Sequence, residues 1–520
     1  METTFRKSMS WLHTWSGVYI SGLLFAIFWM GTLSVFDREI DRWMMPMTRL
    51  PQLQPAPSLD ALARPLAERH APASTQWTFV MPSDRVPVLR VSWRDAANNN
   101  VSQMLDPATG QALPEAGTHA GTGFLYPFHY RLHVRFMNLG YWLVGFATMA
   151  MLAAIVSGVV VHRKIFSEFF TFRPRKNTQR AALDLHNLTG VLVMPFHFVI
   201  GLSGLVILLA TYFPAGWQLA YGNDRQAFNA EANDSYARAR AKAPGTLASL
   251  DAMVARAQAH WGDGEAAQVR VYHPGDANGY VEVRRATDDR VSTDRRTLYF
   301  DAASGALLAG SEFKPVKSVQ SFVSGLHEIQ FRHWTLRWLY FLAGLAGCVM
   351  IATGFLVWLE ARRARHAKKG LAGVRWVEAL AVSSVPGIVM ATLVFFVANR
   401  LLPLGASWAG GQRADLEMWA FYMAWALTLA HAAWAGRAAW RQQAGAIAAL
   451  ALACVLLNWA TTGDHLLLSL SAGQHAVAGM DIALLCTAAV AVWTASKLRW
   501  RAQARAGATA LVLNDKADYA

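Results

Sequence analysis

Long apolar runs alternate with two long polar segments along this chain of 520 residues. The runs fall near residues 11–36, 139–161, 185–213, 336–359, 377–398, 416–436, 444–462 and 477–496. Each is longer than the roughly 18 apolar residues that are typical of a helix crossing a bilayer. The pattern therefore predicts an α-helical polytopic membrane protein with about eight transmembrane helices.

The polar segments predict the division of the chain into spans, external modules and loops. The first part is expected to hold a span at 1–37, a module at 38–135, a span at 136–163 and a basic loop at 164–182. The second part repeats this order with a span at 183–213, a module at 214–333, a span at 334–360 and a basic loop at 361–376. A four-helix C-terminal extension follows at 377–498, and a tail at 499–520.

The two external modules repeat each other. The first has "SLDALARPLAERH" (58–70), "VPVLRVSW" (86–93) and "LDPATGQAL" (105–113), and the second has "SLDAMVARAQAHW" (249–261), "GYVEVRRA" (279–286) and "FDAASGALL" (300–308). Each order predicts a short helix, alternating strands and a hairpin turn in which Gly110 or Gly305 takes a positive φ. We expect two small α+β modules.

The membrane helices repeat as well, so that residues 1–163 and 183–363 are two copies of one arrangement. Gly17 and Gly190 match at an offset of 173 residues, and so do Gly31 and Gly204. Both copies begin on the same side of the membrane, which makes them parallel repeats related by an axis along the membrane normal. Duplication predicts a four-helix core in which equivalent residues of the two copies face each other.

The formal charge of +14 is concentrated in short loops at helix ends. The first loop holds Arg163, Lys164, Arg173, Arg175, Lys176 and Arg180, and the second holds Arg362, Arg363, Arg365, Lys368, Lys369 and Arg375. The positive-inside rule assigns such loops to the cytoplasm, which puts both termini inside and both polar segments outside. Because topology explains the basic excess, we expect no nucleic-acid partner.

Histidines recur at matching places in the two copies. "LHTWSG" (12–17) and "LHNLTG" (185–190) open two membrane runs with His13 and His186, near the inner surface. Leu-His also precedes the second span of each copy, at His133 and His327, near the outer surface. Histidine is costly in a membrane and is usually functional there. Two imidazoles presented from opposite sides suit six-coordinate haem iron, with the porphyrin between the helices.

Three further histidines compete for these roles. His197 lies 11 residues after His186, about three helical turns along and so roughly on the same face. His162 lies at the inner end of the second span, and His129 precedes His133 by four residues on the same face. Any of them can replace a member of the symmetric pairs, and a single histidine can instead form a structural hydrogen bond between helices.

With these motifs the chain resembles the PepSY-associated transmembrane family, which includes bacterial inner-membrane proteins linked to iron uptake and siderophore reduction. The resemblance rests on the Leu-His helix starts, the outer Leu-His motifs and the duplicated modules, over about residues 5–365. It implies a four-helix core that binds two b-type haems. The implied axial ligands are His13 and His186 at the inner positions and His133 and His327 at the outer positions, with His197 and His162 as alternates.

The resemblance also implies periplasmic PepSY modules and a function in iron release. Electrons would cross the inner membrane and reduce a ferric siderophore from Fe(III) to Fe(II) in the periplasm. The donor would be a quinol or a cytoplasmic reductase. The C-terminal four-helix extension departs from the family's pattern, and no motif in it indicates how electrons enter.

Alternatives from other functional classes stay open. PepSY modules also suggest a membrane scaffold that binds peptides or regulates a peptidase. Parallel repeats occur in transporters, here of an iron–siderophore or another metal, although the runs show no broken helix and no buried acid or lysine pair for ion coupling. "WMMPM" (43–47) offers thioethers that suit Cu(I), although such a cluster is more often apolar packing.

Overall fold

The computed structural model describes residues 4–51, 56–95, 97–162, 171–174, 176–311 and 314–517. Arg163, Lys164 and Arg175 of the first predicted basic loop lie outside these residues. The chain divides into two compact units. The helical unit comprises Met1–Met44, Gly117–Phe198 and Tyr340–Ala520, and the sheet unit comprises Met45–Ala116 and Val199–Leu339.

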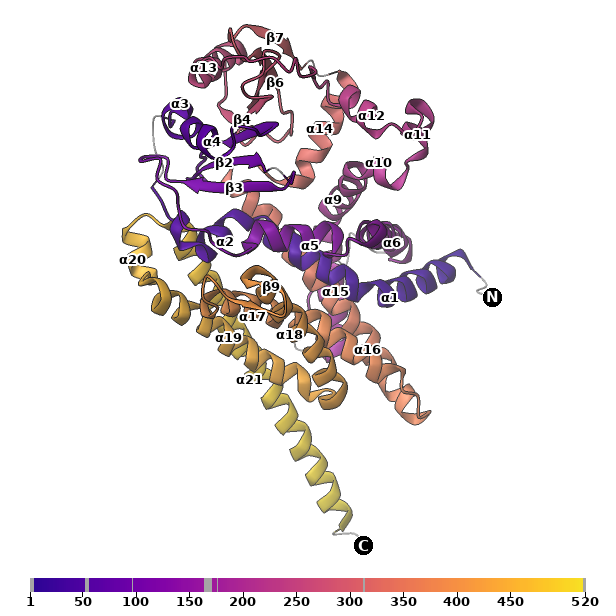
Figure 1. The fold of residues 1–520 in the computed structure, drawn as a ribbon. Helices are drawn as coiled ribbons and strands as arrows, with labels where there is room; N and C mark the ends of the chain where they lie inside the picture. The colour runs from indigo at the N-terminus through magenta and orange to yellow at the C-terminus, as the bar shows by residue number, and fades with distance from the viewer. Residues whose placement is uncertain are drawn as a thin grey trace. The chain divides into compact units, whose positions relative to one another are not determined.

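The helical unit is built from long helices (Figure 1). Its repeat-derived helices are α1 (Phe5–Ser34), α2 (Asp37–Met44), α5 (Tyr126–Arg131), α6 (Leu139–Val161) and α8 (Thr178–Leu192). Two helices run from one unit into the other, α9 (Met194–Ile207) and α15 (Trp334–Lys368). The C-terminal extension contributes α16 (Gly373–Val382), α17 (Ile388–Leu401), α18 (Arg413–Ala435), α19 (Ala438–Thr462), α20 (Leu466–Ser471) and α21 (His475–Ala517).

Six helices of the described residues are long and apolar enough to cross a membrane. They are Phe5–Ser34, Phe136–Val161, Trp334–Lys368, Gly373–Leu401, Ala438–Thr462 and His475–Trp500, and the bent pair α8 and α9 raises the number to seven if it forms one span. The chain is therefore a multi-pass membrane protein. The remaining expected run, at 416–436, folds as α18 but stays outside this set, because its Trp, Tyr and His side chains lower its mean hydropathy.

The third predicted span is broken, which the sequence analysis did not expect. α8 and α9 meet at an angle of 62°, and Val193 between them leaves the helical conformation with φ −106° and ψ 7°. Pro195 follows in the first turn of α9, where its missing N–H would have no helical partner. The proline therefore favours a new helix start over continuation of α8.

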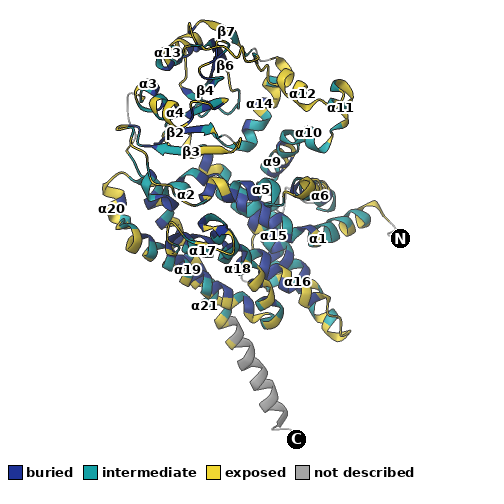
Figure 2. Ribbon diagram, in the orientation of Figure 1, coloured by how far each residue is buried: buried dark blue, intermediate teal, exposed yellow. Residues whose placement is uncertain are grey.

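Buried polar side chains tie the C-terminal extension to the first copy. The indole of Trp43 donates to Asp481 Oδ1 at 2.9 Å, and the guanidinium of Arg400 donates to the carbonyl of Met44 at 2.6 Å. Asp481 is fully buried, as is Glu417 of α18. The expectation that the helices bury no acid is thus wrong, and these acids hold the extension in place. In Figure 2, α17 shows mainly buried positions, whereas α12 (Arg225–Ala232) of the sheet unit is exposed.

The sheet unit joins the two predicted modules into one antiparallel sheet. Its seven strands are β1 (Gln76–Val80), β2 (Leu89–Arg94), β3 (Asn100–Leu105), β4 (Ala266–Tyr272), β5 (Tyr280–Arg285), β6 (Thr297–Asp301) and β7 (Leu307–Gly310), in the order β3-β2-β1-β4-β5-β6-β7. Strand β1 of the first module pairs with β4 of the second, with Thr78 opposite Arg270. The expected hairpin glycines have positive φ, 71° at Gly110 and 68° at Gly305.

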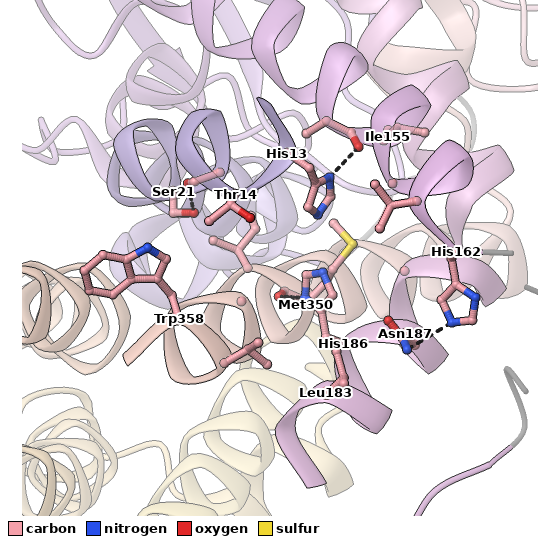
Figure 3. Close-up of a pocket in the computed structure, with 18 of the residues that line it drawn as sticks. His13, Thr14, Ser21, Ile155, His162, Leu183, His186, Asn187, Met350 and Trp358 are labelled. Atoms are coloured by element: carbon pink, nitrogen blue, oxygen red, sulfur yellow. Dashed lines mark hydrogen bonds between the residues drawn. The ribbon is translucent and has the colours of Figure 1, made fainter. Parts of the chain in front are cut away.

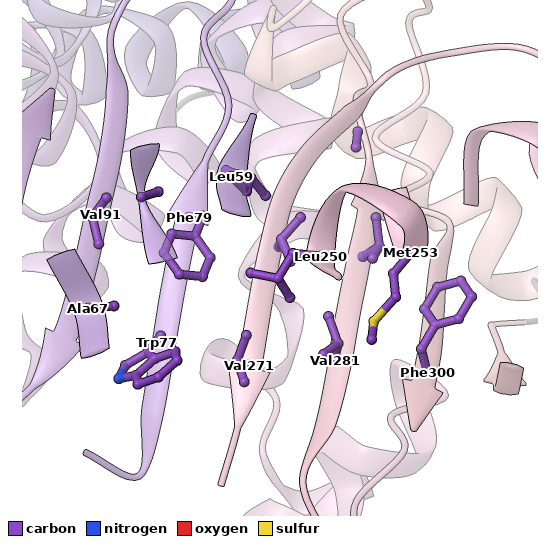
Figure 4. Packing of buried hydrophobic residues seen from close by; sticks show 14 of the residues in the cluster. Leu59, Ala67, Trp77, Phe79, Val91, Leu250, Met253, Val271, Val281 and Phe300 are labelled. Carbon is purple, nitrogen blue, oxygen red and sulfur yellow. The ribbon is translucent and has the colours of Figure 1, made fainter. Parts of the chain in front are cut away.

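Short helices complete the sheet unit. They are α3 (Leu59–Leu62), α4 (Arg64–His70), α10 (Leu209–Tyr212), α11 (Ala215–Tyr221), α13 (Leu250–Trp261) and α14 (Pro315–Glu328). The equivalent helices α3 and α13 cap each other, because Asp60 accepts from the backbone N–H of Leu250 and Asp251 accepts from that of Leu59. Their apolar sides pack on one face of the sheet, where Phe79 and Val281 lie in a single core (Figure 4).

Candidate functional site

A cavity of about 710 Å³ lies within the helical unit, lined by α1, α6, α8, α9 and α15. Four histidines border it, His13, His162, His186 and His197. Figure 3 shows the first three of them. Its volume lies within the roughly 300–1,000 Å³ that small-molecule and cofactor sites occupy. Its remaining lining is predominantly apolar, as such sites generally are.

His13 of α1 is fixed against α6. Its Nδ1 lies 2.9 Å from the carbonyl oxygen of Ala154 and 3.4 Å from the hydroxyl of Ser157. Gly158 makes this approach possible, because a Cβ there would lie 3.2 Å from the imidazole Cε1. The small residues Ser157 and Gly158 of α6 therefore leave room for the imidazole of His13.

His186 of α8 repeats this arrangement against α15. Its Nδ1 lies 2.8 Å from the carbonyl oxygen of Met350, to which the Thr353 hydroxyl also donates. A Cβ at Gly354 would lie 3.4 Å from the imidazole Cε1. In both copies the imidazole Nδ1 lies on a backbone carbonyl that also accepts from a nearby hydroxyl, Ser157 or Thr353, and a glycine lies against the ring.

This geometry fixes which nitrogen each ring offers. A backbone carbonyl can only accept, so Nδ1 carries the proton and Nε2 keeps its lone pair. The ring centroids of His13 and His186 lie 6.3 Å apart with their planes at 80°. Two imidazoles that ligate one metal from opposite sides at about 2 Å would place their centroids about 6 Å apart. The separation, the tautomer and the cavity all fit a bis-histidine haem site.

The same local arrangement recurs at His129 and at His327. In the helical unit, His129 Nδ1 lies 2.8 Å from the carbonyl of Ile27, and a Cβ at Gly31 would meet its ring at 2.6 Å. In the sheet unit, His327 Nδ1 lies 2.7 Å from the carbonyl of Ile200. Gly204, which matches Gly31 in the repeat, approaches the His327 ring in the same way.

His133 has a different environment from the other predicted ligands. Its Nε2 lies 2.8 Å from the carbonyl of Phe124, and its ring stacks on the Phe124 ring at a centroid distance of 4.8 Å. Its backbone has φ 55°, and burial lowers the pKa of its imidazole to about 4. On local geometry, His129 is therefore the counterpart of His327.

The two alternate histidines contribute to the cavity in different ways. The side-chain amide of Asn187 lies 3.1 Å from His162 Nε2, so this nitrogen is engaged in a hydrogen bond. His162 therefore contributes a polar group to the cavity lining. His197 is fully buried, with Nε2 3.3 Å from the carbonyl of Ala343 and the ring of Phe28 at a centroid distance of 5.5 Å. Its Nδ1 has no hydrogen-bond partner among the described residues.

Comparisons with known proteins identify the family of the chain. A family model described as the PepSY-associated TM region matches residues 10–361, which include α6, α8 and most of α1 and α15, the helices that seat His13 and His186. Among similar proteins is Uncharacterized protein PA4219 of Pseudomonas aeruginosa, 26% identical over 298 residues that cover 54% of this chain and 73% of that protein. Because the family model spans well over half of the 520 residues, the chain belongs to the family of the PepSY-associated TM region.

Proposed function

We propose that this chain is a haem-binding electron-transfer protein of the bacterial inner membrane. The observation that carries the proposal is the His13–His186 pair, whose imidazoles lie 6.3 Å apart beside a cavity of about 710 Å³. Both rings are anchored through Nδ1 and both offer Nε2. Such preorganised pairs are typical of metal ligation rather than of helix packing alone.

In this function the chain's own residues position and protect the cofactor. His13 and His186 would hold the haem iron, and the carbonyls of Ala154 and Met350 would fix the ring orientation and raise the basicity of Nε2. The apolar lining excludes water and so favours binding of the macrocycle. A bound haem supplies one-electron chemistry, and two histidine ligands leave no open position on the iron.

The number of two haems remains a prediction. His129 in the helical unit and His327 in the sheet unit are each a candidate further ligand by their own local geometry. Each has its Nδ1 on a backbone carbonyl and its ring against a glycine, as His13 and His186 do. His133 uses its Nε2 for a hydrogen bond to Phe124. We therefore favour His129 over His133.

The substrate that we propose is a ferric siderophore. Such a carrier binds Fe(III) tightly through hard oxygen ligands and Fe(II) far less tightly, so adding one electron releases the metal. In this proposal the apolar runs form eight spans and the sheet unit is composed of two PepSY modules. The positive-inside rule then favours cytoplasmic termini and a periplasmic sheet unit. A quinol or a cytoplasmic reductase would supply the electron.

The decisive experiment measures haem in purified protein from haem-replete cells. The wild type is expected to show a Soret band that shifts on reduction with dithionite, and His13→Ala and His186→Ala are each expected to lose about half of the haem or more. His475→Ala serves as the control, because this exposed histidine begins α21 and does not line the cavity. A colourless wild type, or full haem content in both variants, would contradict the proposal.

A transporter of iron–siderophore or another metal is the second candidate, favoured by the 62° break between α8 and α9. Broken spans form substrate sites in many transporters. Uptake into proteoliposomes separates the two functions. Accumulation of ferric siderophore by protein that contains no haem would support transport, whereas haem-dependent reduction without accumulation would support electron transfer.

A further inference from the structure

Three guanidinium groups border the same cavity, those of Arg6 in the first turn of α1, Arg180 in the first turn of α8, and Arg362 towards the end of α15. These are the basic ends of the helices that seat His13 and His186. Arginine at such a position binds carboxylates and phosphates well, because its planar group can donate two parallel hydrogen bonds. The partners that each arginine already has decide which of them can bind a ligand.

Arg180 already has a carboxylate partner. Its Nε lies 3.1 Å from Asp184, which also pairs with Arg173 at 2.9 Å. Asp184 is only 4% exposed, so this acid is committed to the two arginines. The positive charge of Arg180 is therefore largely neutralised by Asp184 and is not available to a ligand in the cavity.

Arg6 and Arg362 have no such acid. Arg6 Nε donates to the carbonyl of Val161 at 3.2 Å, and Arg362 lies over the ring of Trp358 at 4.6 Å. Within the described part of the chain, neither has a carboxylate at ion-pair distance. Stacking on Trp358 holds the Arg362 guanidinium beside the cavity while leaving its N–H donors for a ligand.

A haem is itself an anionic ligand, since its macrocycle carries two propionate carboxylates along one edge. We propose that Arg6 and Arg362 bind these carboxylates, so that the polar edge of the cofactor is held at the arginine-lined mouth of the cavity. The inference rests on the proposed function, because it concerns the ligand of the same cavity. If the arginines bind the propionates, the site should bind haem more tightly than a macrocycle of similar size whose propionates carry no charge.

The test compares haem with haem dimethyl ester, whose carboxylates are blocked. Apo-protein in phosphatidylcholine nanodiscs is titrated with each compound, and binding is followed by the Soret band. We expect the wild type to bind haem at least about tenfold more tightly than the ester, the factor that one charge-assisted interaction supplies. In Arg6→Gln/Arg362→Gln this preference should fall towards one, with affinity for the ester unchanged.

Two further variants serve as controls for the loss of charge and for the loss of an arginine elsewhere on α15. Arg362→Lys keeps the charge and should retain part of the preference even if the loss of stacking disturbs α15. Arg365→Gln removes an exposed arginine of the same helix that does not line the cavity, and it should behave as the wild type.

The outcomes for the wild type distinguish the haem site itself from the propionate contacts. A wild type that binds both compounds equally would overturn the propionate contacts and leave the haem site standing. A wild type that binds neither would overturn the haem site and this inference together. If the double variant keeps the wild-type preference for haem over the ester, the arginines do not bind the propionates and the inference is wrong.

Discussion

Glycine determines how closely each anchored histidine approaches the neighbouring helix. In every case the glycine lies four residues after the carbonyl that receives the imidazole N–H, so it occupies the same helix face one turn along. The pairs of histidine and glycine are His13 with Gly158, His186 with Gly354, His129 with Gly31 and His327 with Gly204. A Cβ at Gly31 or Gly204 would lie 2.6 or 2.8 Å from the imidazole, so the ring would have to shift, whereas a Cβ at Gly158 or Gly354 would lie at 3.2 or 3.4 Å.

The assignment of His129 leads to a prediction at the scale of single residues. His129→Ala is expected to lower haem content, because it removes an imidazole whose Nδ1 is fixed on the carbonyl of Ile27 in the way that His13 and His186 are fixed on theirs. His133→Ala should leave the haem content unchanged and only loosen packing on Phe124. Haem per protein by the pyridine haemochrome assay checks both variants, and the reverse pattern would restore His133 as the ligand.

The sequence alone could not distinguish these two histidines. His129 lies 28 residues before Ser157 and His133 lies 24 before it, whereas His327 lies 26 residues before the matching Thr353. The spacing of 26 residues is therefore equally far from that of His129 and that of His133. The Leu-His motif favours His133, whereas the local geometry of His327 is matched at His129. Leu132 and His133 have positive φ, so the backbone turns there in a way that helical spacing does not anticipate.

Among the elements, the pairing of β1 with β4 is the feature that the sequence predicts least, because it joins the two modules into one sheet. Periodicity predicted the strands of each module, because alternation is a local property of the sequence. The pairing of one module with the other depends on contacts between residues about 190 positions apart, which no local pattern records. The break between α8 and α9 was missed for a similar reason, since a proline in an apolar run allows either a kink or a new helix.

Engineered cysteines can test the shared sheet. Thr78→Cys with Arg270→Cys is expected to form a disulfide, because these residues are direct partners across β1 and β4. The control pair, Thr78→Cys with Glu282→Cys, places the thiols two strands apart, about 10 Å, which is beyond disulfide reach. Both pairs are made with Cys486→Ser, which removes the exposed native thiol. Cross-linking in the control but not in the test pair would disprove the register.

At the scale of the whole molecule, the C-terminal extension is part of the fold and not a loose addition. Hydropathy indicated its helices, but their attachment depends on buried polar contacts that a hydropathy pattern does not register. Asp481→Ala is expected to destabilise the helical unit by about 1–3 kcal/mol, because it leaves the buried indole N–H of Trp43 without its acceptor.

Thermal unfolding of the detergent-solubilised protein measures this loss. Thr487→Ala on the same helix is the control, since this exposed hydroxyl only donates to the carbonyl of Ala483. Equal melting temperatures for the wild type and Asp481→Ala would show that the contact contributes nothing to the attachment.

The pairing of β1 with β4 also has a consequence for whether one copy of the repeat can be lost during evolution. Once both copies contributed strands to one sheet, removal of either copy by recombination would expose a bare strand with unpaired backbone groups, a template for aggregation. Selection against misfolding would then preserve both halves even if only one kept a chemical task. Descendants of the original duplication are expected to drift apart in sequence while remaining double.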